Sequence, residues 1–399
     1  MLDGALATPT IAGVPLDTLQ RELIARSLRG ARAPALVVDV GWVNGLAAIR
    51  SLGRAGIPVL ALDHRASPLG FRSRYAVPVR CPDPLTEEPA FVELLAELGE
   101  FVGAPAPVFA THDEGLNAIA RNADALAEHF RFPFPPWQTL ERVQKKSAQL
   151  ERANEVGVDV PRTRRPATAQ EARTAASELG LPVLVKPSDP VGFKRRFRRQ
   201  AFRCETLGEV EDAYARAEPF APMVQELVPG GDDALYTVGS YLAEDGRALG
   251  VFCGRKLRQA PRGIGTCRVG EAVWVQEVVD AALRLLGAFE YNGLSQVELK
   301  RDARDGRYRL MEINPRLWQW HGLAAACGVD LPRIAYADLV GESVPPAEMN
   351  GDGKRWAITL LAGEPPVFLR PPYVDAVFAR DDPKPAFVQA ARFARAALS

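Results

Sequence analysis

The 399 residues of this chain are enough for two or three domains, and a composition of 47% hydrophobic and 25% charged residues is that of an ordinary globular protein. The 49 Lys and Arg residues balance the 49 Asp and Glu residues, which argues against a protein whose overall charge binds nucleic acid or anionic membranes. The five scattered cysteines contain no C-x-x-C pair, which argues against a disulfide framework and a structural zinc site and fits a reducing compartment.

The start of the chain lacks the basic and apolar segments of a signal peptide. No apolar run approaches the roughly 20 residues that are needed to span a bilayer. We therefore expect a cytoplasmic protein without a membrane partner. Residues 1–33 are expected to be an extension, with one helical pattern over 16–28.

A first domain is expected over residues 34–136. The apolar run at 35–40 is typical of a strand buried on both faces of a parallel sheet. A glycine turn, a helical pattern and a second apolar run at 58–63 complete a βαβ unit, and residues 108–111 begin another. This order predicts an α/β domain of the Rossmann type.

The first turn of this domain reads Gly41-Trp-Val-Asn-Gly45 and differs from the dinucleotide-binding pattern G-x-G-x-x-G. The bulk of Trp42 blocks the close approach of a pyrophosphate to the backbone. A nicotinamide or flavin dehydrogenase is therefore disfavoured.

The run Pro133-Phe-Pro-Pro136 marks a domain boundary. After it we expect a small α+β domain over 137–228, in which one helix covers 139–156. A larger, antiparallel domain is expected over 229–345 and a strand and helix appendage over 346–399. The predicted fold class is therefore α/β followed by α+β.

A hairpin near residue 305 is the most informative part of the sequence. Two strand-like runs flank Asp305-Gly306, a good hairpin signal. If the turn centres on Asp305, Glu298 lies directly opposite Glu312 on one face. Asn314, two residues further on, points to the same side.

Two carboxylates that face each other across a ladder repel and destabilise a plain sheet. A divalent cation between Glu298 and Glu312 would convert that cost into binding, and oxygen ligands of this kind suit Mg²⁺. The alternative is a solvated outer face on which both glutamates meet water.

Glu312-Ile-Asn-Pro-Arg316, with a carboxylate fourteen residues upstream, resembles the metal site of ATP-grasp enzymes, in particular their carbamoyl-phosphate-synthase-like and D-aspartate-ligase-like branch. The resemblance covers residues 35–341. It implies a Rossmann-like pre-ATP-grasp domain followed by a two-subdomain ATP-grasp fold. It also implies ATP and Mg²⁺, with Mn²⁺ as an alternative, and a metal site formed by Glu298, Glu312 and Asn314.

The same resemblance assigns nucleotide contacts upstream of the hairpin. The phosphate-binding lysines would be Lys186 and Lys146, although Lys145 is adjacent to the latter. A hinge would hold adenine, and an aspartate after it would meet the ribose hydroxyls. These residues would be Glu226, Leu227 and Val228 in the hinge and Asp233, or Asp232, at the ribose.

Two further groups complete the expected site. Lys256 and Arg258 alternate onto one strand face, where they would meet phosphates or a carboxylate, unless that face is merely solvated. Arg316 would steady the transferred phosphoryl group. Many amino-acid ligases of this superfamily have an arginine at the position of Gln296, so oxyanion stabilisation here would fall to Arg258 or Arg316.

The segment 189–199 contains the basic run Lys194-Arg-Arg-Phe-Arg-Arg199 and is expected to be a loop, where the family has a mobile phosphate lid. It would cap a triphosphate or attract an anionic substrate. A solvated loop without a ligand is equally consistent with this sequence, and an RNA-binding arm is a less favoured third alternative.

Four positions are expected to influence substrate choice: Arg74 in Ser73-Arg74-Tyr75, Thr111, His112 and the region of Trp318. For Arg74 an ordinary surface role is equally consistent, and Thr111 to Glu114 fit the start of a helix as well. Trp318, Trp320 and His321 are more typical of core or cavity wall than of catalysis.

The sequence therefore predicts a ligase that joins a small-molecule carboxylate to an amine through an acylphosphate, with no nucleic acid partner. Homodimer formation is left open. The alternatives are a bicarbonate-using carboxylase or carbamoyl-type enzyme, and a non-catalytic ATP-binding module. The presence of both Glu298 and Glu312 argues against a non-catalytic module, because a protein that binds ATP without turnover has little need of a second metal carboxylate.

Overall fold

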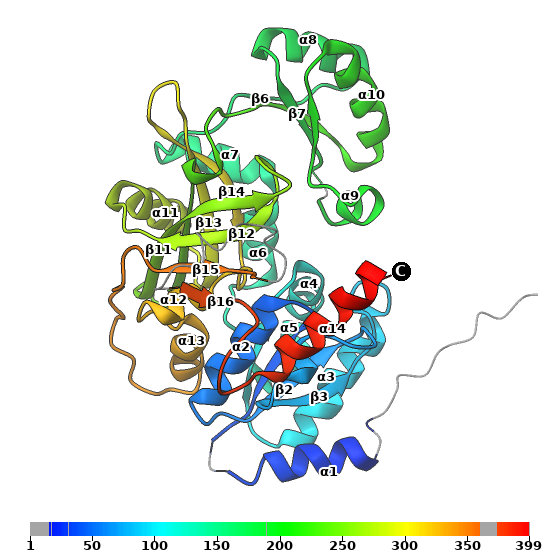
Figure 1. Cartoon of the computed structure of the whole chain (residues 1–399), viewed down its shortest axis with the longest axis vertical. Helices are drawn as coiled ribbons and strands as arrows, with labels where there is room; N and C mark the ends of the chain where they lie inside the picture. Colours follow the sequence, from blue (N-terminus) through cyan, green and yellow to red (C-terminus); the bar gives the residue numbers. More distant parts are fainter. Residues whose placement is uncertain (1–15, 17, 31, 189, 360–372, 399) are drawn as a thin grey trace, which may run out of the picture.

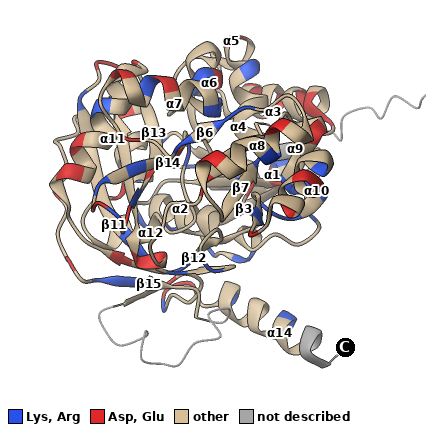
Figure 2. Ribbon diagram, turned by 90° about the horizontal axis from the view of Figure 1, so that it is seen from above, with Lys and Arg blue, Asp and Glu red and all other residues tan. Residues whose placement is uncertain are grey.

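The protein is described from a computed structural model, which covers residues 16, 18–30, 32–188, 190–359 and 373–398. Three sheets make up its framework (Figure 1). No helix among these residues is long and apolar enough to cross a bilayer. Lys and Arg are interspersed with Asp and Glu along the ribbon, as the balanced composition leads one to expect (Figure 2).

The first sheet is parallel, with strand order β3-β2-β1-β4-β5. Its strands are β1 (Ala35–Val38), β2 (Val59–Asp63), β3 (Ala76–Arg80), β4 (Ala106–Ala110) and β5 (Phe130–Arg131). The helices around it are α1 (Thr18–Ser27), α2 (Val43–Arg54), α3 (Glu88–Val102), α4 (Asp113–Arg121), α5 (Ala123–Leu126) and the 3₁₀ turn η1 (Gly70–Arg72). The predicted Rossmann-like domain is confirmed, and β1, β2 and β4 are buried along their whole length, as their apolar runs predicted.

The second sheet forms a small unit that we call the lid, residues 163–226. Its strand order is β6-β9-β7-β8, and all its pairs are antiparallel. Its elements are β6 (Thr163–Arg164), α8 (Ala169–Leu179), β7 (Val183–Lys186), α9 (Pro190–Phe197), β8 (Phe202–Cys204), α10 (Leu207–Ala217), η2 (Glu218–Phe220) and β9 (Met223–Glu226). The lid has a hydrophobic core of its own and stands above the rest of the molecule in Figure 1.

The basic segment of the lid was expected to be a loop, and this expectation was wrong. Residues Pro190–Phe197 form helix α9. Phe193 and Phe197 lie one helical turn apart and pack against Phe202 and Phe220, with ring centroids 4.8–6.0 Å apart. This aromatic stripe gives the segment a buried face, while Lys194, Arg195 and Arg196 remain exposed.

The third sheet has the order β14-β13-β10-β11-β12-β15-β16. Its strands are β10 (Leu235–Leu242), β11 (Ala248–Ala260), β12 (Thr266–Ala272), β13 (Gly293–Arg301), β14 (Tyr308–Asn314), β15 (Arg355–Ala357) and β16 (Tyr373–Asp375). The accompanying helices are η3 (Asp232–Ala234), α11 (Gln276–Ala288), α12 (Gly322–Ala326) and α13 (Leu331–Leu339). The last helix, α14 (Lys384–Leu398), lies against η1 of the first domain. One hydrophobic core joins this sheet to α2 and β1 of the first domain.

Two helices lead from the first domain to the lid, where a single helix was expected. They are α6 (Trp137–Gln144) and α7 (Lys146–Glu155). Lys145 between them is extended, with φ −72° and ψ 115°. The break turns the chain so that Lys146 reaches across to the third sheet, as described below.

Candidate active site

The β13–β14 hairpin places the two predicted metal ligands directly opposite each other, since Glu298 pairs with Glu312 and Gln296 with Asn314. The predicted cross-strand pairing of the two glutamates is therefore confirmed, and their role as metal ligands stays a prediction. The assumed turn centre was half a residue off, because Leu299 pairs with Leu310 and the strands reverse between Arg304 and Asp305. A β-bulge at Met311 absorbs the difference and restores the expected register at the site.

Each glutamate is held by a different lysine. Lys256 Nζ lies 3.0 Å from Glu298 Oε1, and Lys146 Nζ lies 3.3 Å from Glu312 Oε2. Asn314 donates a hydrogen bond of 2.9 Å to Glu312, and Gln296 donates one of 2.9 Å to Glu298. Glu298 is only 7% exposed, so it does not lie on the solvated outer face that the alternative required, whereas the side chain of Glu312 is 32% exposed and borders the cavities.

The two glutamates differ in proton affinity. Burial raises the pKa of Glu298, Lys256 opposes this, and the charge of Glu312 raises it further. Burial also acts to raise the pKa of Glu312, but the charge of Lys146 and the hydrogen bond from Asn314 hold it below its ordinary value. Glu312 is therefore held ionised, whereas Glu298 has a raised affinity for a proton, and a nearby positive charge would lower the pKa of either carboxylate.

Lys186 ends strand β7 and projects from the lid toward the hairpin. Its Nζ donates a hydrogen bond of 3.1 Å to Gln225. Burial and the nearby charge of Lys146 lower its pKa to about 8. The lysines of lid and helix α7 thus repel each other in the absence of an anion, and a phosphate between them would relieve that repulsion.

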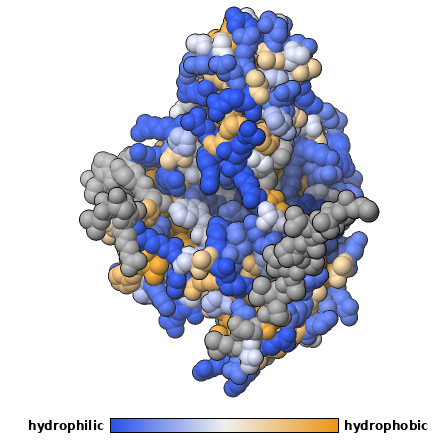
Figure 3. Space-filling model, turned by 90° about the vertical axis from the view of Figure 1, so that its right-hand side faces the viewer, coloured by the Kyte–Doolittle hydropathy of each residue, from blue (hydrophilic) through white to orange (hydrophobic). Residues whose placement is uncertain are grey.

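Two cavities meet at these residues, in the hollow beneath the lid that Figure 3 shows. One, of about 60 Å³, lies between lid and third sheet; the other, of about 400 Å³, opens toward the first domain. Lys186, Gln200 and Glu312 line both, so the cavities adjoin. The smaller volume lies below the roughly 300–1,000 Å³ of typical ligand sites, so a nucleotide requires the lid to stand further from the sheet.

The predicted hinge is only partly in the smaller cavity. Leu227 and Val228 line it. The carboxylate of Glu226 is instead buried in ion pairs with Arg162 (2.9 Å) and Arg304 (3.0 Å), which lower its pKa against the effect of burial. Glu226 therefore joins the lid to the β13–β14 turn through its side chain, and its backbone remains the part available to a base.

Asp232 and Asp233 have different surroundings. Asp232 accepts hydrogen bonds from the backbone of Gln259 (2.9 Å) and Gly263 (2.9 Å) and so fixes the loop after β11. Asp233 is exposed. Neither aspartate is among the described residues that line the smaller cavity, so the ribose contact stays a prediction for both.

The expected alternation of Lys256 and Arg258 onto one face was wrong. Lys256 pairs with Gly270 and Arg258 with Val269, so Leu257 is the extra residue of a β-bulge. Gln259 lines the nucleotide cavity together with Lys256, and Arg258 is not among the described residues of that lining. A bulge shifts the two-residue period by one, and no local signal in the sequence marked it.

Arg316 joins the hairpin to the first domain. Its Nε and Nη2 lie 2.6 and 3.2 Å from the two carboxylate oxygens of Asp113, and its Nη2 lies 3.5 Å from Asn314 Oδ1. Asp113 more than offsets the effect of burial and raises the pKa of Arg316. Burial and the charge of Arg316 lower the pKa of His112 to about 3, so this imidazole is neutral at physiological pH.

A charged side chain packs against the glycine turn of the first domain. A Cβ atom at Gly41 would lie 2.4 Å from Nη1 of Arg65, which packs there and pairs with Asp63 at 3.0 Å. This flexible guanidinium gives no further argument against a pyrophosphate, so the exclusion continues to rest on the bulk of Trp42.

Other residues that were singled out in the sequence have structural roles. Ser73 and the backbone of Arg74 bind Asp382 near the C-terminus, at 2.8 and 2.9 Å, and Arg74 itself is exposed. The geometry favours an anchoring role for this motif over the carboxylate-binding one. Trp318 and His321 are buried in the shared core, as the wall or core interpretation expected.

The cavity linings include polar side chains that were not singled out in the sequence, among them Gln200, Gln259 and Lys300. Lys300 lies two residues from Glu298 on the same strand, so the two-residue period was sufficient to find it. Gln200 and Gln259 follow an irregular segment and a bulge, and nothing in the local pattern marked them.

The donor set fits a magnesium ion. Two carboxylates and an amide are hard oxygen ligands, and Lys256 and Lys146 now supply the positive charge that such an ion would bring. Among the described residues no group of three His, Cys, Asp or Glu side chains could hold a metal, so phosphate and water would complete the shell. The Asn314 amide now turns its nitrogen to Glu312 and would have to reverse to offer oxygen.

Comparison with known proteins gives relatives at low identity, and no family model matches the chain. The chain is 24% identical over 273 residues to a D-aspartate ligase of Enterococcus faecium, a match that covers 64% of each protein. It is 26% identical over 242 residues to the carbamoyl phosphate synthase large chain of Pyrococcus furiosus, covering 58% of this chain but 22% of that one. The chain thus spans less than two thirds of the length of these relatives.

A solved structure shows the same arrangement of elements. The biotin carboxylase of Campylobacter jejuni, in complex with an ATP analogue, superimposes with a TM-score of 0.63 and 18% identity, over 80% of this chain and 74% of that one. At 18% identity, this structural similarity shows the fold alone.

Proposed function

We propose, from the ATP-grasp fold of this chain and its sequence relationship to D-aspartate ligase and carbamoyl phosphate synthase, that it is an ATP-dependent ligase joining a carboxylate to an amine. The observation that carries the proposal is the facing pair Glu298 and Glu312, each neutralised by its own lysine, at the junction of two adjoining cavities. A purely structural sheet gains nothing from gathering two acids and two lysines at one point, of which Glu298 and Lys256 are buried, because each desolvated charge costs free energy.

The reaction consists of two transfers. An oxygen of the substrate carboxylate attacks the γ-phosphorus of ATP, the bond to the β-phosphate oxygen breaks, and ADP leaves. The amine nitrogen then attacks the acyl carbon of the acylphosphate, loses a proton, and inorganic phosphate departs with the C–O bond electrons.

The chain positions groups and balances charge in this scheme. Lys146 and Lys186 hold phosphate oxygens from two sides, and Lys256 stays near Glu298. Mg²⁺ on Glu298, Glu312 and Asn314, with Mn²⁺ as an alternative, would neutralise charge that develops on the phosphates. The lid excludes water and so protects the acylphosphate from hydrolysis.

Arg316 is the residue best placed to stabilise the reacting carboxylate or phosphoryl group, since it lines the larger cavity and is oriented by Asp113. Gln296, at the position of an arginine in many amino-acid ligases, is bound to Glu298, Thr237 and Asn314 and so orders the metal ligands. We assign the oxyanion role to Arg316 in preference to Arg258.

A matrix of carboxylates and amines, with bicarbonate and ammonia included, tests the proposal by ADP release. Release that requires both an acid and an amine supports ligation. Release with bicarbonate as the one effective acid would place the chain with carboxylating or carbamoylating enzymes.

The matched variants are Glu312→Gln, which removes one metal carboxylate, and Glu277→Gln, which removes an exposed carboxylate on α11. We expect loss of acid- and amine-dependent ADP release in the first and unchanged release in the second. Equal turnover in both variants would refute the assigned site.

A further inference from the structure

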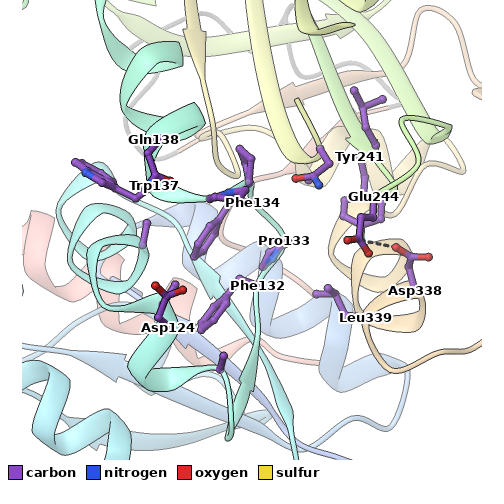
Figure 4. Close-up of a pocket in the computed structure, with 18 of the residues that line it drawn as sticks. Asp124, Phe132, Pro133, Phe134, Trp137, Gln138, Tyr241, Glu244, Asp338 and Leu339 are labelled. Atoms are coloured by element: carbon purple, nitrogen blue, oxygen red, sulfur yellow. Dashed lines mark hydrogen bonds between the residues drawn. The ribbon is translucent and has the colours of Figure 1, made fainter. Parts of the chain in front are cut away.

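A separate cavity of about 440 Å³ lies on another part of the molecule, where the first domain meets the third sheet (Figure 4). It is bounded by α4 and α5, by the proline-rich segment 132–136, by the start of α6, and by the ends of β10 and α13. None of its lining residues belongs to the two cavities at the hairpin.

The walls of this cavity are aromatic. The rings of Phe132 and Phe134 stack with centroids 5.2 Å apart and an interplanar angle of 24°. Trp137 and Tyr241 add further ring surface. The guanidinium of Arg121 already lies 5.3 Å from the centre of the Trp137 ring, so this environment accommodates a cation over an aromatic face.

The charges around the rings are mostly acidic. Figure 4 shows Asp124 on one side of the phenylalanines and Glu244 and Asp338 on the other. Asp338 is held by a hydrogen bond of 2.7 Å from Tyr241. Among the residues lining the cavity Arg121 is the single cationic one, and its Nε donates at 3.1 Å to Glu88, which lies outside the lining.

Helix α6 leads from this cavity to the β13–β14 hairpin. Helix α6 begins at Trp137 in the cavity wall, runs for ~12 Å and ends at Gln144. Gln144 donates a hydrogen bond of 2.8 Å to Asn117, both in the larger hairpin cavity, and Lys146 follows with its contact to Glu312. A small rotation of α6 therefore changes the position of Lys146.

We propose that this cavity binds a small organic cation with an apolar or aromatic body, such as an arylalkylamine, and that its occupancy changes the affinity of the nucleotide site. The rings take the apolar body, and Asp124, Glu244 and Asp338 attract the ammonium group. The second half of the inference rests on the proposed nucleotide site, while the first half does not.

The binding test compares three probes of one shape by calorimetry without nucleotide: phenethylammonium, 2-phenylethanol and phenylacetate. We expect phenethylammonium to bind most tightly, 2-phenylethanol less tightly and phenylacetate most weakly. The double variant Glu244→Gln/Asp338→Asn should lose about tenfold or more for the cation, because two carboxylates lose their charge. Glu342→Gln, an exposed carboxylate just beyond α13, is the control and should bind as the parent does.

Equal affinity for phenethylammonium and phenylacetate, or a double variant that binds like the parent, would show that the cavity is a water-filled gap between domains and would overturn the inference. A variant with a lower Tm than the parent would be replaced by Phe132→Leu, which keeps all charges and should weaken all three probes.

The coupling test repeats the titration with a saturating, non-hydrolysable ATP analogue and Mg²⁺. By linkage, the change in probe affinity must equal the change that the probe causes in analogue affinity. Matching shifts of several-fold support the coupling. Unchanged affinities in a protein that binds both molecules would overturn the coupling and leave the ligase proposal intact.

Discussion

The carboxylate of Asp113 binds the guanidinium of Arg316 through two contacts, of 2.6 and 3.2 Å, across 203 residues of sequence. Asp113 begins helix α4 of the first domain, and Arg316 lies two residues beyond Asn314. This ion pair links the first domain to the segment that follows the hairpin, in addition to the backbone hydrogen bond of 2.8 Å that Leu294 of β13 donates to Pro133. It fixes the arginine that we assign to the reacting group.

Asp113→Asn should leave nucleotide affinity nearly unchanged and lower kcat by roughly 10- to 100-fold, because a displacement of ~1 Å in a catalytic group has effects of this order. Asp113→Glu should recover part of the loss. Asp280→Asn, on the exposed face of α11, is the control. A drop in the free energy of unfolding that fully accounts for the lost activity would contradict a positioning role.

Glu312→Gln should lower kcat on the order of 10²-fold or more, because the residue would help hold the ion that neutralises phosphate charge. The apparent affinity for Mg²⁺ should fall as well, and both are measured by varying Mg²⁺ at fixed ATP. An unchanged Mg²⁺ dependence would mean that the two glutamates hold no metal.

Nucleotide binding should weaken as the pH rises from 7 to 9. Lys186 has a pKa of about 8, so its ammonium charge is present below this value and lost above it. Titrating a non-hydrolysable ATP analogue at several pH values measures the effect. Lys186→Arg should flatten the profile, because a guanidinium stays charged, whereas Lys186→Met should bind weakly at every pH.

Two neighbouring aspartates near the C-terminus should differ in their contribution to stability. Asp382 is 1% exposed and pairs with Arg50 at 2.9 Å, whereas Asp381 pairs with the exposed Arg54. Asp382→Ala should reduce the free energy of unfolding by about 3–5 kcal/mol, since a buried charge is left without its partner. Asp381→Ala should cost at most about 1 kcal/mol.

Urea denaturation of both variants gives the comparison. Equal losses would mean that the C-terminal segment does not hold to the first domain through Asp382. The pair Arg50→Met/Asp382→Leu should recover part of the lost stability, because it removes both charges together.

Gly239→Ala should destabilise the third sheet. A Cβ atom there would lie 1.8 Å from the Trp318 ring, in a fully buried region. Overpacking of this kind costs about 1–3 kcal/mol. Gly287→Ala on helix α11, where a Cβ meets no atom within 4 Å, is the control and should be neutral or stabilising when followed by thermal unfolding.

Local patterns in the sequence were sufficient for much of the fold and for the centre of the site. The apolar runs predicted β1, β2 and β4, and the turn at Asp305 predicted a hairpin in which Glu298 faces Glu312, a register that the bulge at Met311 restores. Such features depend on residues close together in the chain, so composition and spacing decide them. The nature of α9 was missed because Phe202 and Phe220, outside the segment, give it a buried face.

The sequence by itself determined that acids and lysines of the right kind occur at the right spacing for an ATP-grasp site. Tertiary structure alone decided which lysine neutralises which glutamate, that a bulge puts Gln259 rather than Arg258 beside Lys256, and that Asp113 holds Arg316. These contacts join segments far apart in sequence, and their geometry depends on how whole sheets and helices pack. No pattern within a single strand or helix contains that information.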